Sequence, residues 1–599
     1  MNVSEYIIKY IEEKRINHIF AVVGGASLWL FKALNDSGEI KPIFTNHEQA
    51  AVMAADGWAR VNCKPGIVFT INGPGMTNTV TGIAQAWVDS SPVILITGNS
   101  NSASVNYERQ RNMRQYGTQD VRTDLIMHPI TKKTFYLDRA SDVKKCLDEA
   151  FYVAMEGRPG PICIEVPINI QSSQVPEGLE GWEPEKKIRQ YGTEKVKMII
   201  SKINAAKRPL ILAGQGVRLS GAVEQLNVLT RKMGIPVVTS RMGIDVISED
   251  SEFYVGRPGN HGSRAAHFAI QTCDLLLILG SRMAPNTTGY HVEGFSNQSY
   301  KILVEIDESE MEKNLLKIDE VIPGDIKEFL EETLCLVDTM GKMEHHEVWQ
   351  SCCQKWRETY PIIKPEYYQT KKLSTYAAVE TVADLAEEGA YILSDTGSCC
   401  SIVAQVWKIK KQQRLFISGG LSAMGYWATS MGIALDKGLS NQVICFVGDG
   451  SLQMNIQELA TLNQYQIPVK LFVISNNGYQ FVRMSQESYG FNPTYGTSVA
   501  EGVPIPDIKR LVEAYGLNYV SCDSIESLED IVKITINQNG PIVCEIFVDE
   551  NQEVCPRLKS VALPDGTFRA PKYENLYPFL PENVLEKEKK MAMRKEDKK

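Results

Sequence analysis

The stretch that decides the fold is Gly448-Asp449-Gly450-Ser451, followed 27 residues after its aspartate by Asn476-Asn477-Gly478. The preceding residues, NQVICFV, are apolar and β-prone, and the following LQMNIQELATLNQY has helical spacing. The next run, PVKLFVIS, is again typical of a strand. The pattern predicts a βαβ unit in which both polar clusters follow parallel strands and meet at one edge of a sheet.

The polar residues of these two clusters are oxygen donors. Asp449 offers a carboxylate, Asn476 an amide oxygen and Gly478 a backbone carbonyl. These are ligands that Mg²⁺ prefers when a diphosphate completes its shell. The two glycines of the first cluster let the backbone approach phosphate groups, and a helix beginning near Ser451 offers unpaired N–H groups. Because Gly-Asp-Gly alone is also a common turn, the prediction depends on the whole arrangement.

The full arrangement resembles the thiamine diphosphate (ThDP) signature of the acetolactate synthase and pyruvate decarboxylase superfamily. A second match is Thr45-Asn46-His47-Glu48-Gln49-Ala50-Ala51, which lies between the strand-like KPIF and the helical QAAVMAADGWAR. In that family the glutamate contacts the pyrimidine ring of the cofactor and promotes proton loss from its reactive carbon. The resemblance therefore implies a catalytic role for Glu48, although a glutamate there can also simply stabilise a helix N-terminus.

Three further stretches, residues 23–27, 71–98 and 116–135, resemble acetolactate synthase blocks in order and spacing. Without these matching blocks, Gln119 and Lys132 would be interpreted as solvent-exposed surface residues. The resemblance implies that Gly25 and Gln119 act in catalysis, that Gly24, Gly73 and Asn78 hold the cofactor, and that Lys132 contacts the substrate.

The carboxyl-terminal half contributes a second diphosphate loop. Asp395-Thr396-Gly397-Ser398 follows the strand-like AYILS and resembles this loop, although Ser398 and Cys399 replace the Gln and His that family members often carry. Met424, within GGLSAMGY, matches the bulky apolar residue that separates the two rings of the cofactor. The resemblance thus implies cofactor contacts from Gly397, Ser398, Met424, Gly448, Asp449, Gly450, Ser451, Asn476 and Gly478, with Asp449, Asn476 and Gly478 as the metal ligands.

Composition favours a cytoplasmic enzyme. The chain has 599 residues, 43% of them hydrophobic and 23% charged, which is enough to bury several cores. Its net charge of −9 argues against a nucleic-acid partner. We find neither a signal peptide nor an apolar run of membrane-spanning length, so no membrane partner is expected. The 13 cysteines lack C-x-x-C spacing, which predicts reduced thiols.

Strand and helix signals alternate in three blocks, which predicts an α/β protein with three parallel-sheet domains. The resemblance implies that these are pyrimidine-binding, central and diphosphate-binding domains, as in ThDP-dependent decarboxylases. The expected boundaries are 1–175 for the pyrimidine-binding domain, 190–340 for a central nucleotide-binding-like domain, 365–555 for the diphosphate- and Mg²⁺-binding domain, and 556–599 for a carboxyl-terminal extension with a charged tail.

The central block leaves the presence of FAD open. Acetolactate synthases bind FAD there, and Ala213-Gly214-Gln215-Gly216 and Arg282 echo that site. The family's R-F-D-D-R-V-T-G segment is, however, replaced by RMAPNTTG from Arg282 to Gly289, which loses its acidic and second basic positions. The domain could therefore hold FAD, hold another nucleotide or hold none. A Rossmann dehydrogenase is disfavoured, because no GxGxxG with a downstream acid follows a strand.

We call Asp449, Asn476 and Gly478 with their flanking glycines the metal-diphosphate clamp. The segment after this clamp, from Tyr479 to Gln486, resembles the active-site helix and mobile loop of the family, and Val482 and Ser485 are its candidate substrate contacts. Acetolactate synthases of amino-acid biosynthesis place a tryptophan at the position of Ser485. A serine opens the pocket, which implies an acceptor larger or more polar than pyruvate.

The resemblance implies a ThDP- and Mg²⁺-dependent carboligase. Such an enzyme decarboxylates a 2-oxo acid, with pyruvate as the expected acid, and transfers the acyl carbanion to an acceptor carbonyl. The family also implies a homo-oligomer, a dimer or a tetramer, because its cofactor lies between subunits. A 2-oxo acid decarboxylase and a ThDP-dependent C–C hydrolase remain alternatives. A catalytically retired binding subunit is disfavoured, since Glu48, Asp449 and Asn476 are all present.

Overall fold

The structure is a computed structural model. It describes residues 1–185, 191–313, 315–341, 343–435, 442–562, 568–569 and 571–593. Residue 190, at the expected start of the central domain, and residues 594–599 of the charged tail lie outside the described residues. The chain forms two compact units: the first comprises residues 1–186, 390–399 and 416–550, and the second comprises residues 187–389, 400–415 and 551–599.

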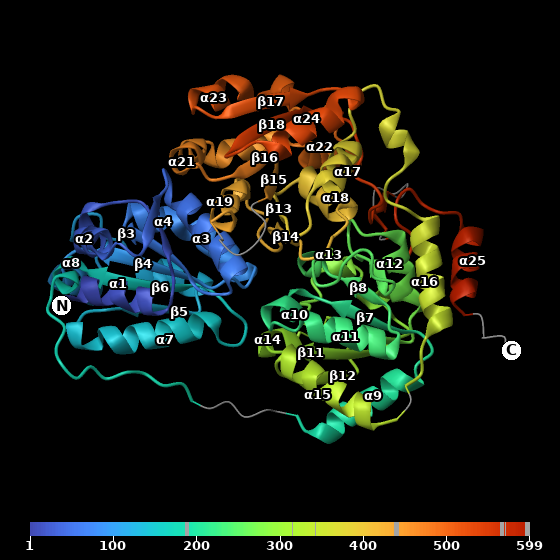
Figure 1. Cartoon of the computed structure of the whole chain (residues 1–599), viewed down its shortest axis with the longest axis horizontal. Helices are drawn as coiled ribbons and strands as arrows, with labels where there is room; N and C mark the ends of the chain where they lie inside the picture. Colours follow the sequence, from blue (N-terminus) through green and yellow to red (C-terminus); the bar gives the residue numbers. More distant parts are fainter. Residues whose placement is uncertain are drawn as a thin grey trace. The chain divides into compact units, whose positions relative to one another are not determined.

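The first unit begins with a six-stranded parallel sheet of order β2-β1-β3-β4-β6-β5. Its apolar strands β3, β4 and β6 are almost wholly buried, as expected for a parallel sheet with both faces covered. Helices α1 and α7 lie on one face, and α3 and α4 on the other (Figure 1). The strands are β1 (His18–Ala21), β2 (Lys41–Phe44), β3 (Gly66–Ile71), β4 (Val93–Asn99), β5 (Lys133–Tyr136) and β6 (Ile162–Pro167), and the main helices are α1 (Val3–Glu13), α2 (Leu28–Ser37), α3 (Glu48–Asn62), α4 (Pro74–Val88), α5 (Ser102–Arg111) and α7 (Val143–Met155).

A second six-stranded sheet, of order β14-β13-β15-β16-β18-β17, carries the predicted βαβ unit. The predicted strands around the Gly-Asp-Gly motif are confirmed, and β15 pairs in parallel with β16. The single predicted helix is instead divided into α20 (Asp449–Leu452), a short 3₁₀ turn and α21 (Glu458–Tyr465). The strands are β13 (Tyr391–Ser394), β14 (Arg414–Ile417), β15 (Val443–Gly448), β16 (Val469–Ser475), β17 (Asn518–Cys522) and β18 (Ile542–Phe547), and the helices include α18 (Ser398–Val406), α19 (Thr429–Ile433), α22 (Gln480–Ser488), α23 (Ile508–Ala514) and α24 (Ile525–Asn537).

Helices α3 and α19 join these two sheets within the first unit, and one hydrophobic core runs through both. Their contact depends on two glycines. A Cβ on Gly57 would lie 2.2 Å from the Thr429 carbonyl oxygen, and one on Gly432 would lie 1.7 Å from the Ala54 carbonyl oxygen. The helices therefore touch backbone to backbone, which no larger residue permits.

The second unit is built on a parallel sheet of order β12-β11-β10-β7-β8-β9. Read from β9, this is the 3-2-1-4-5-6 order of doubly wound nucleotide-binding folds. The three sheets confirm the predicted α/β class with parallel sheets. The strands are β7 (Pro209–Ala213), β8 (Val237–Thr239), β9 (Tyr254–Gly256), β10 (Leu275–Leu279), β11 (Tyr300–Glu305) and β12 (Glu320–Pro323), and the main helices are α9 (Thr193–Ala205), α11 (Val223–Met233), α12 (Arg264–Thr272), α15 (Ile326–Thr339), α16 (Glu347–Thr359) and α17 (Thr375–Leu385).

The carboxyl-terminal residues complete the second unit. The ring of Tyr573 stacks on His267 at 4.2 Å between centroids. Helix α25 (Glu582–Ala592) packs on α12 and α16, where the Trp356 indole donates to the Glu588 carboxylate at 2.9 Å. Among the described residues, no helix is both long and apolar enough to cross a membrane. All 13 cysteines are free thiols.

We predict that Gly432→Ala destabilises the protein by about 3 kcal/mol or more, because the new methyl group has no space between α19 and α3. Thermal unfolding and soluble yield measure this effect. Gly192→Ala is the matched control, since a Cβ there meets no atom of the described residues within 4 Å. Equal melting temperatures of the two variants would contradict the close helix contact.

Candidate functional site

Asp449 lies at the carboxyl edge of the second sheet, where β15 ends and α20 begins. Its carboxylate accepts hydrogen bonds from the backbone N–H groups of Gly450 at 2.7 Å and of Asn476 and Gly478 at 3.1 Å each. The side chain is only 2% exposed. Burial raises its pKa to about 6, although the backbone hydrogen bonds partly oppose that rise. The two predicted clusters therefore meet as the βαβ pattern predicted.

Asn476 presents an oxygen without a partner. Its side-chain nitrogen donates to the Gln480 side-chain oxygen at 3.0 Å and to the Ser398 hydroxyl at 3.3 Å. These two contacts fix the orientation of the amide, and its Oδ1 is buried with no hydrogen-bond partner. An unsatisfied buried oxygen is costly unless something binds it. A hard cation next to Asp449 is such a group.

The glycines around the clamp have different surroundings. Gly397 has a φ of +95°, and a Cβ on Gly397 or Gly448 would meet nothing within 4 Å. Their backbones therefore face open space, as a diphosphate cradle requires. Gly450 instead packs against the Tyr479 ring, and the Gly478 carbonyl accepts from the Gln480 N–H at 3.2 Å, which leaves one lone pair for a ligand.

These observations fit Mg²⁺ with a diphosphate. The donors are one carboxylate, one amide oxygen and one backbone carbonyl, from Asp449, Asn476 and Gly478. Among the described residues, no group of three or more His, Cys, Asp and Glu side chains could hold a metal. A site with a single carboxylate is nevertheless sufficient for Mg²⁺, which commonly takes one or two carboxylates plus phosphate oxygens.

The segment that carries Met424 is held by Ser451, a predicted cofactor contact, and by Asn455 and Asp395, which sequence reasoning did not assign to the site. The Gly425 N–H donates to the Ser451 hydroxyl at 2.9 Å, and the Asn455 amide donates to the Gly425 carbonyl at 2.8 Å. Asp395 accepts from the Trp427 N–H at 3.0 Å, and burial raises its pKa to about 6. Because these partners are distant in sequence, only the fold brings them together.

Glu48 is the first residue of α3, at the edge of the first sheet. Its carboxylate accepts from the Asn78 side-chain amide at 2.9 Å. Gly75 approaches the same carboxylate, since a Cβ there would lie 3.4 Å from it. The structure therefore brings Glu48 and Asn78 into direct contact. Among the described residues, no hydrogen bond joins this pair to Asp449 or Asn476.

Of the predicted glycine loops, the loop of Gly73 lies against Gln119. Gln119 has a φ of +64°, and a Cβ on Gly73 would lie 2.2 Å from its carbonyl oxygen. Gly24 packs against Ile71 at the end of β3, whereas a Cβ on Gly25 would meet nothing. These four predicted residues therefore belong to loops at the carboxyl edge of the first sheet.

A buried polar network anchors the loop of Gln119. Asn72 donates to Asp120 at 2.8 Å and to Asn99 at 2.5 Å, and Asn99 donates to Glu165 at 2.7 Å. Arg109 pairs with Glu165 at 2.8 Å. Burial raises the pKa of Glu165, and Arg109 partly offsets this rise. The five members of the network come from five separate segments of the chain, so no sequence motif marks it.

The predicted substrate residues differ in their surroundings. The Lys132 ammonium donates to the carbonyl oxygens of Glu156 at 2.5 Å and Arg158 at 2.9 Å, so it also holds a loop. Val482 is 49% exposed on α22. Ser485 is exposed on the same helix, and its hydroxyl donates to the Phe481 carbonyl at 2.9 Å.

The residues of the central sheet fit FAD poorly. Ala284, Pro285 and Asn286 stand at the family's two acidic and second basic positions, and they offer no charged group. The Arg282 carbonyl is bound by Lys313. The strand order of this sheet reverses between β7 and β10, and the loops after these two strands are already in backbone contact. A Cβ on Gly214 would lie 2.1 Å from the Gly280 carbonyl oxygen.

We predict that Mg²⁺-dependent ThDP binding weakens as the pH falls through about 6, because the proton competes with the metal for Asp449. At pH 5 the loss is about tenfold relative to pH 7. The same raised pKa means that the protein without metal gains stability from this group as the pH falls from about 6 to about 4. Calorimetry on the native protein and on the Asp449→Asn variant checks this prediction. The variant should bind ThDP weakly, and its ThDP affinity and its stability should lose the pH dependence that Asp449 causes. An unchanged pH profile in the variant would contradict it.

We also predict that Asp120→Ala lowers the melting temperature and reduces turnover at least tenfold, because the buried Asn72 amide loses one of its two partners and the loop of Gln119 loses its anchor. Asp142→Ala is the control, since Asp142 forms an exposed pair with Arg139 outside the network. Thermal unfolding and steady-state kinetics measure both effects. Comparable losses in the control would show that the network has no special role.

Three family models match the chain. They are "Thiamine pyrophosphate enzyme, N-terminal TPP binding domain" over residues 1–124, "Thiamine pyrophosphate enzyme, central domain" over residues 196–333, and "Thiamine pyrophosphate enzyme, C-terminal TPP binding domain" over residues 395–546. Glu48 and Asn78 lie in the first match, and Asp449 and Asn476 in the third.

Curated proteins are similar to the chain over most of its length. An "Acetolactate synthase large subunit" of Pyropia yezoensis is 32% identical over 560 residues, which cover 90% of this chain and 91% of that protein. One from Lactococcus lactis subsp. lactis is 31% identical over 563 residues, with 93% and 94% covered. A "Probable acetolactate synthase large subunit" of Methanocaldococcus jannaschii is 31% identical over 566 residues, with 92% of each chain covered.

Proposed function

The chain belongs to the thiamine pyrophosphate enzyme family, among relatives of the acetolactate synthase large subunit, and from this premise we propose that it is a Mg²⁺-dependent carboligase. The proposed reaction removes carbon dioxide from a 2-oxo acid, pyruvate in the first instance, and joins the remaining acyl group to an acceptor carbonyl. The observation that carries the proposal is the buried Oδ1 of Asn476, which has no partner among the described residues, on a residue whose backbone N–H donates to the Asp449 carboxylate.

Asp449, Asn476 and the Gly478 carbonyl would hold Mg²⁺ and, through it, the diphosphate. Gly397, Ser398, Gly448, Gly450 and Ser451 would surround the phosphates. When bound, ThDP supplies the carbon nucleophile and the electron sink that decarboxylation and C–C bond formation require. The Asn476 amide supports this assignment, because both of its side-chain hydrogen bonds are made by the nitrogen, so that among the described residues its oxygen has no partner.

Glu48 would exchange a proton with the pyrimidine ring. Asn78 donates to one of its oxygens and so orients the carboxyl group. Gly24 and Gly73 would admit the cofactor, and Met424 would support its bent shape. The carboxylate of Glu48 is the only chemistry-bearing side chain in this group, and we assign it the proton transfer.

Gln119 and the Gly25 backbone would orient the donor and acceptor at the reacting carbon. The buried network behind Asp120 supports this role, since it anchors the loop in which Gln119 has a φ of +64°. Lys132 would lie near the substrate entrance. Helix α22 and the exposed segment after it would exclude water, which otherwise diverts the reaction to simple decarboxylation.

The acceptor would be larger or more polar than pyruvate. Val482 and Ser485 are both exposed on α22, and Ser485 is small. A keto sugar or a polar aldehyde suits such a surface. An acceptor of this kind would make the enzyme similar to acetolactate synthase in its first half-reaction and different in its second.

The enzyme would act as a homodimer or homotetramer in the cytoplasm. The Glu48–Asn78 pair and the Asp449 clamp share no hydrogen bond among the described residues. In an oligomer, the Glu48–Asn78 pair of one copy would face the Asp449 clamp of another. Free thiols at all 13 cysteines agree with a reducing compartment. We assign no role to FAD. The proposed domains are residues 1–175, 190–340 and 365–555, with the extension 556–599.

We predict that Glu48→Gln retains ThDP binding within about threefold but slows hydrogen–deuterium exchange at C2 of the bound cofactor by about 100-fold or more. The amide keeps the hydrogen bond to Asn78 but cannot transfer the proton in the same way. NMR of quenched exchange samples measures the rate. Glu39→Gln, on an exposed residue of the same unit, is the control. Unchanged exchange in Glu48→Gln would remove its catalytic role.

The overall function is tested by carbon dioxide release with ThDP, Mg²⁺ and a panel of 2-oxo acids, with and without aldehydes and keto sugars. Mass spectrometry identifies the products. Carbon dioxide with a condensed product supports the carboligase. Carbon dioxide with only free aldehyde would replace it by a decarboxylase, and no release despite tight ThDP binding would favour a C–C hydrolase or a binding subunit.

A further inference from the structure

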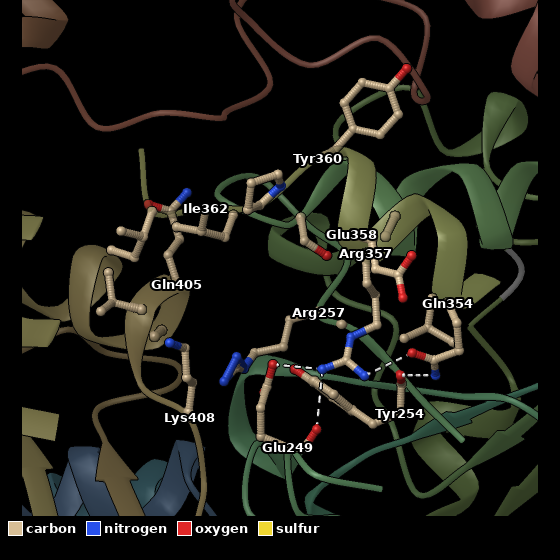
Figure 2. Close-up of a pocket in the computed structure, with 18 of the residues that line it drawn as sticks. Glu249, Tyr254, Arg257, Gln354, Arg357, Glu358, Tyr360, Ile362, Gln405 and Lys408 are labelled. Carbon is tan, nitrogen blue, oxygen red and sulfur yellow. Dashed lines mark hydrogen bonds and ion pairs between the residues drawn. The ribbon is translucent and has the colours of Figure 1, made fainter. Parts of the chain in front are cut away.

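The second unit contains a cavity of about 410 Å³ (Figure 2). None of the residues assigned to ThDP is among those that line it. This volume lies in the range of small-molecule sites. The walls come from β9 and the loop after it, the carboxyl-terminal end of α16, the segment 360–363, and the end of α18. The residues that carry the argument are Tyr254, Arg257, Arg357, Ile362, Val406 and Lys408.

Two of the three cations in the wall are already neutralised. Arg357 pairs with the Glu249 carboxylate at 2.9 Å and donates to the Gln354 side-chain oxygen at 3.1 Å, as Figure 2 shows. Lys408 pairs with Glu380 at 3.0 Å. Their positive charges are therefore largely balanced before any ligand arrives.

Arg257 differs from both. Its Nη2 donates to the Trp407 carbonyl at 2.6 Å, and its Nε is buried without an acceptor. Among the described residues, no carboxylate lies within 4.0 Å of its guanidinium. The guanidinium also lies over the Tyr254 ring at 5.8 Å. The cavity wall thus contains one guanidinium that is ordered by protein contacts but lacks a counter-anion.

The neighbouring groups add no negative charge beside Arg257. His261, in the same wall, stays neutral, because burial and then the charges of Arg241 and Arg557 lower its pKa to about 3. Glu249 is engaged with Arg357, and Glu358 is exposed at the rim. A planar guanidinium with free donors is suited to a carboxylate.

Much of the rest of the wall is apolar, although the polar Ser263 and Gln405 also line it. Pro361, Ile362 and Ile363 line it from the segment after α16, and Ala404 and Val406 from α18. Tyr254 and Tyr360 contribute aromatic rings. We propose that this cavity binds a small organic carboxylate with an apolar body, whose carboxylate contacts Arg257 and whose body packs against Ile362 and Val406. This site lies beyond the proposed reaction and does not rest on it.

The test uses the full chain without ThDP, with benzoate as the probe and benzamide as its neutral match. Ligand-observed NMR titration up to about 20 mM measures affinity. For a ligand of this size we expect a Kd on the order of 1 mM for benzoate and at least tenfold weaker binding of benzamide. Arg257→Met should weaken benzoate binding at least tenfold, and Arg257→Lys should recover part of it.

Ile362→Trp provides a second variant, because it fills the cavity from the opposite wall and leaves Arg257 intact. It should abolish benzoate binding while thermal unfolding stays near that of the native protein. Arg114→Met, on an exposed arginine of the first unit, should leave the affinity unchanged. Absence of benzoate binding, equal binding of benzamide, or unchanged affinity in both Arg257→Met and Ile362→Trp would each overturn the proposal.

Discussion

The contact between α3 and α19 is the constraint on which the first unit depends. Gly57 and Gly432 let the two helices meet backbone to backbone, and this contact sets how the two sheets pack. Glu48 begins α3, while the segment with Met424 leads into α19. Beside the crossing, the Tyr426 hydroxyl donates to Asp56 at 2.8 Å and Arg60 donates to that hydroxyl at 2.6 Å. The position of both functional segments is therefore decided by the absence of two side chains.

The candidate site concentrates buried carboxylates, and burial alone would be unfavourable for them. Asp449 and Asp395 each receive backbone N–H groups, yet the pKa of each still rises to about 6. Asp89, whose pKa burial also raises to about 6, accepts from the N–H groups of Gly419 and Gly420. Backbone donors thus hold three loops around carboxylates whose charge is incompletely compensated. A cation at Asp449 would supply the compensation that the protein lacks there.

Local sequence was enough to predict the parallel sheets and the meeting of the Asp449 and Asn476 clusters at one sheet edge, because strand ends and helix starts depend on nearby residues. The resemblance singled out Glu48 and Asn78, but it did not predict the hydrogen bond between them. It did not predict Asp395 holding Trp427, nor the chain of side chains behind Asp120. Those contacts join residues far apart in sequence, and no spacing rule relates them. For Lys132 the sequence indicated the position in a motif but not the binding partners. Its ammonium binds the carbonyl oxygens of Glu156 and Arg158, and only the fold shows these contacts.

The docking of the carboxyl-terminal residues on the second unit has a consequence for synthesis. The sheet of that unit is complete at β12, whereas Tyr573 and α25, which cover His267 and α16, come much later in the chain. During translation the apolar faces of α12 and α16 therefore stay uncovered until the sheet of β13 to β18 has been synthesised. Transient exposure of this kind invites aggregation. The nascent chain should need chaperone protection at this surface, and a ribosome stalled before residue 571 would display it.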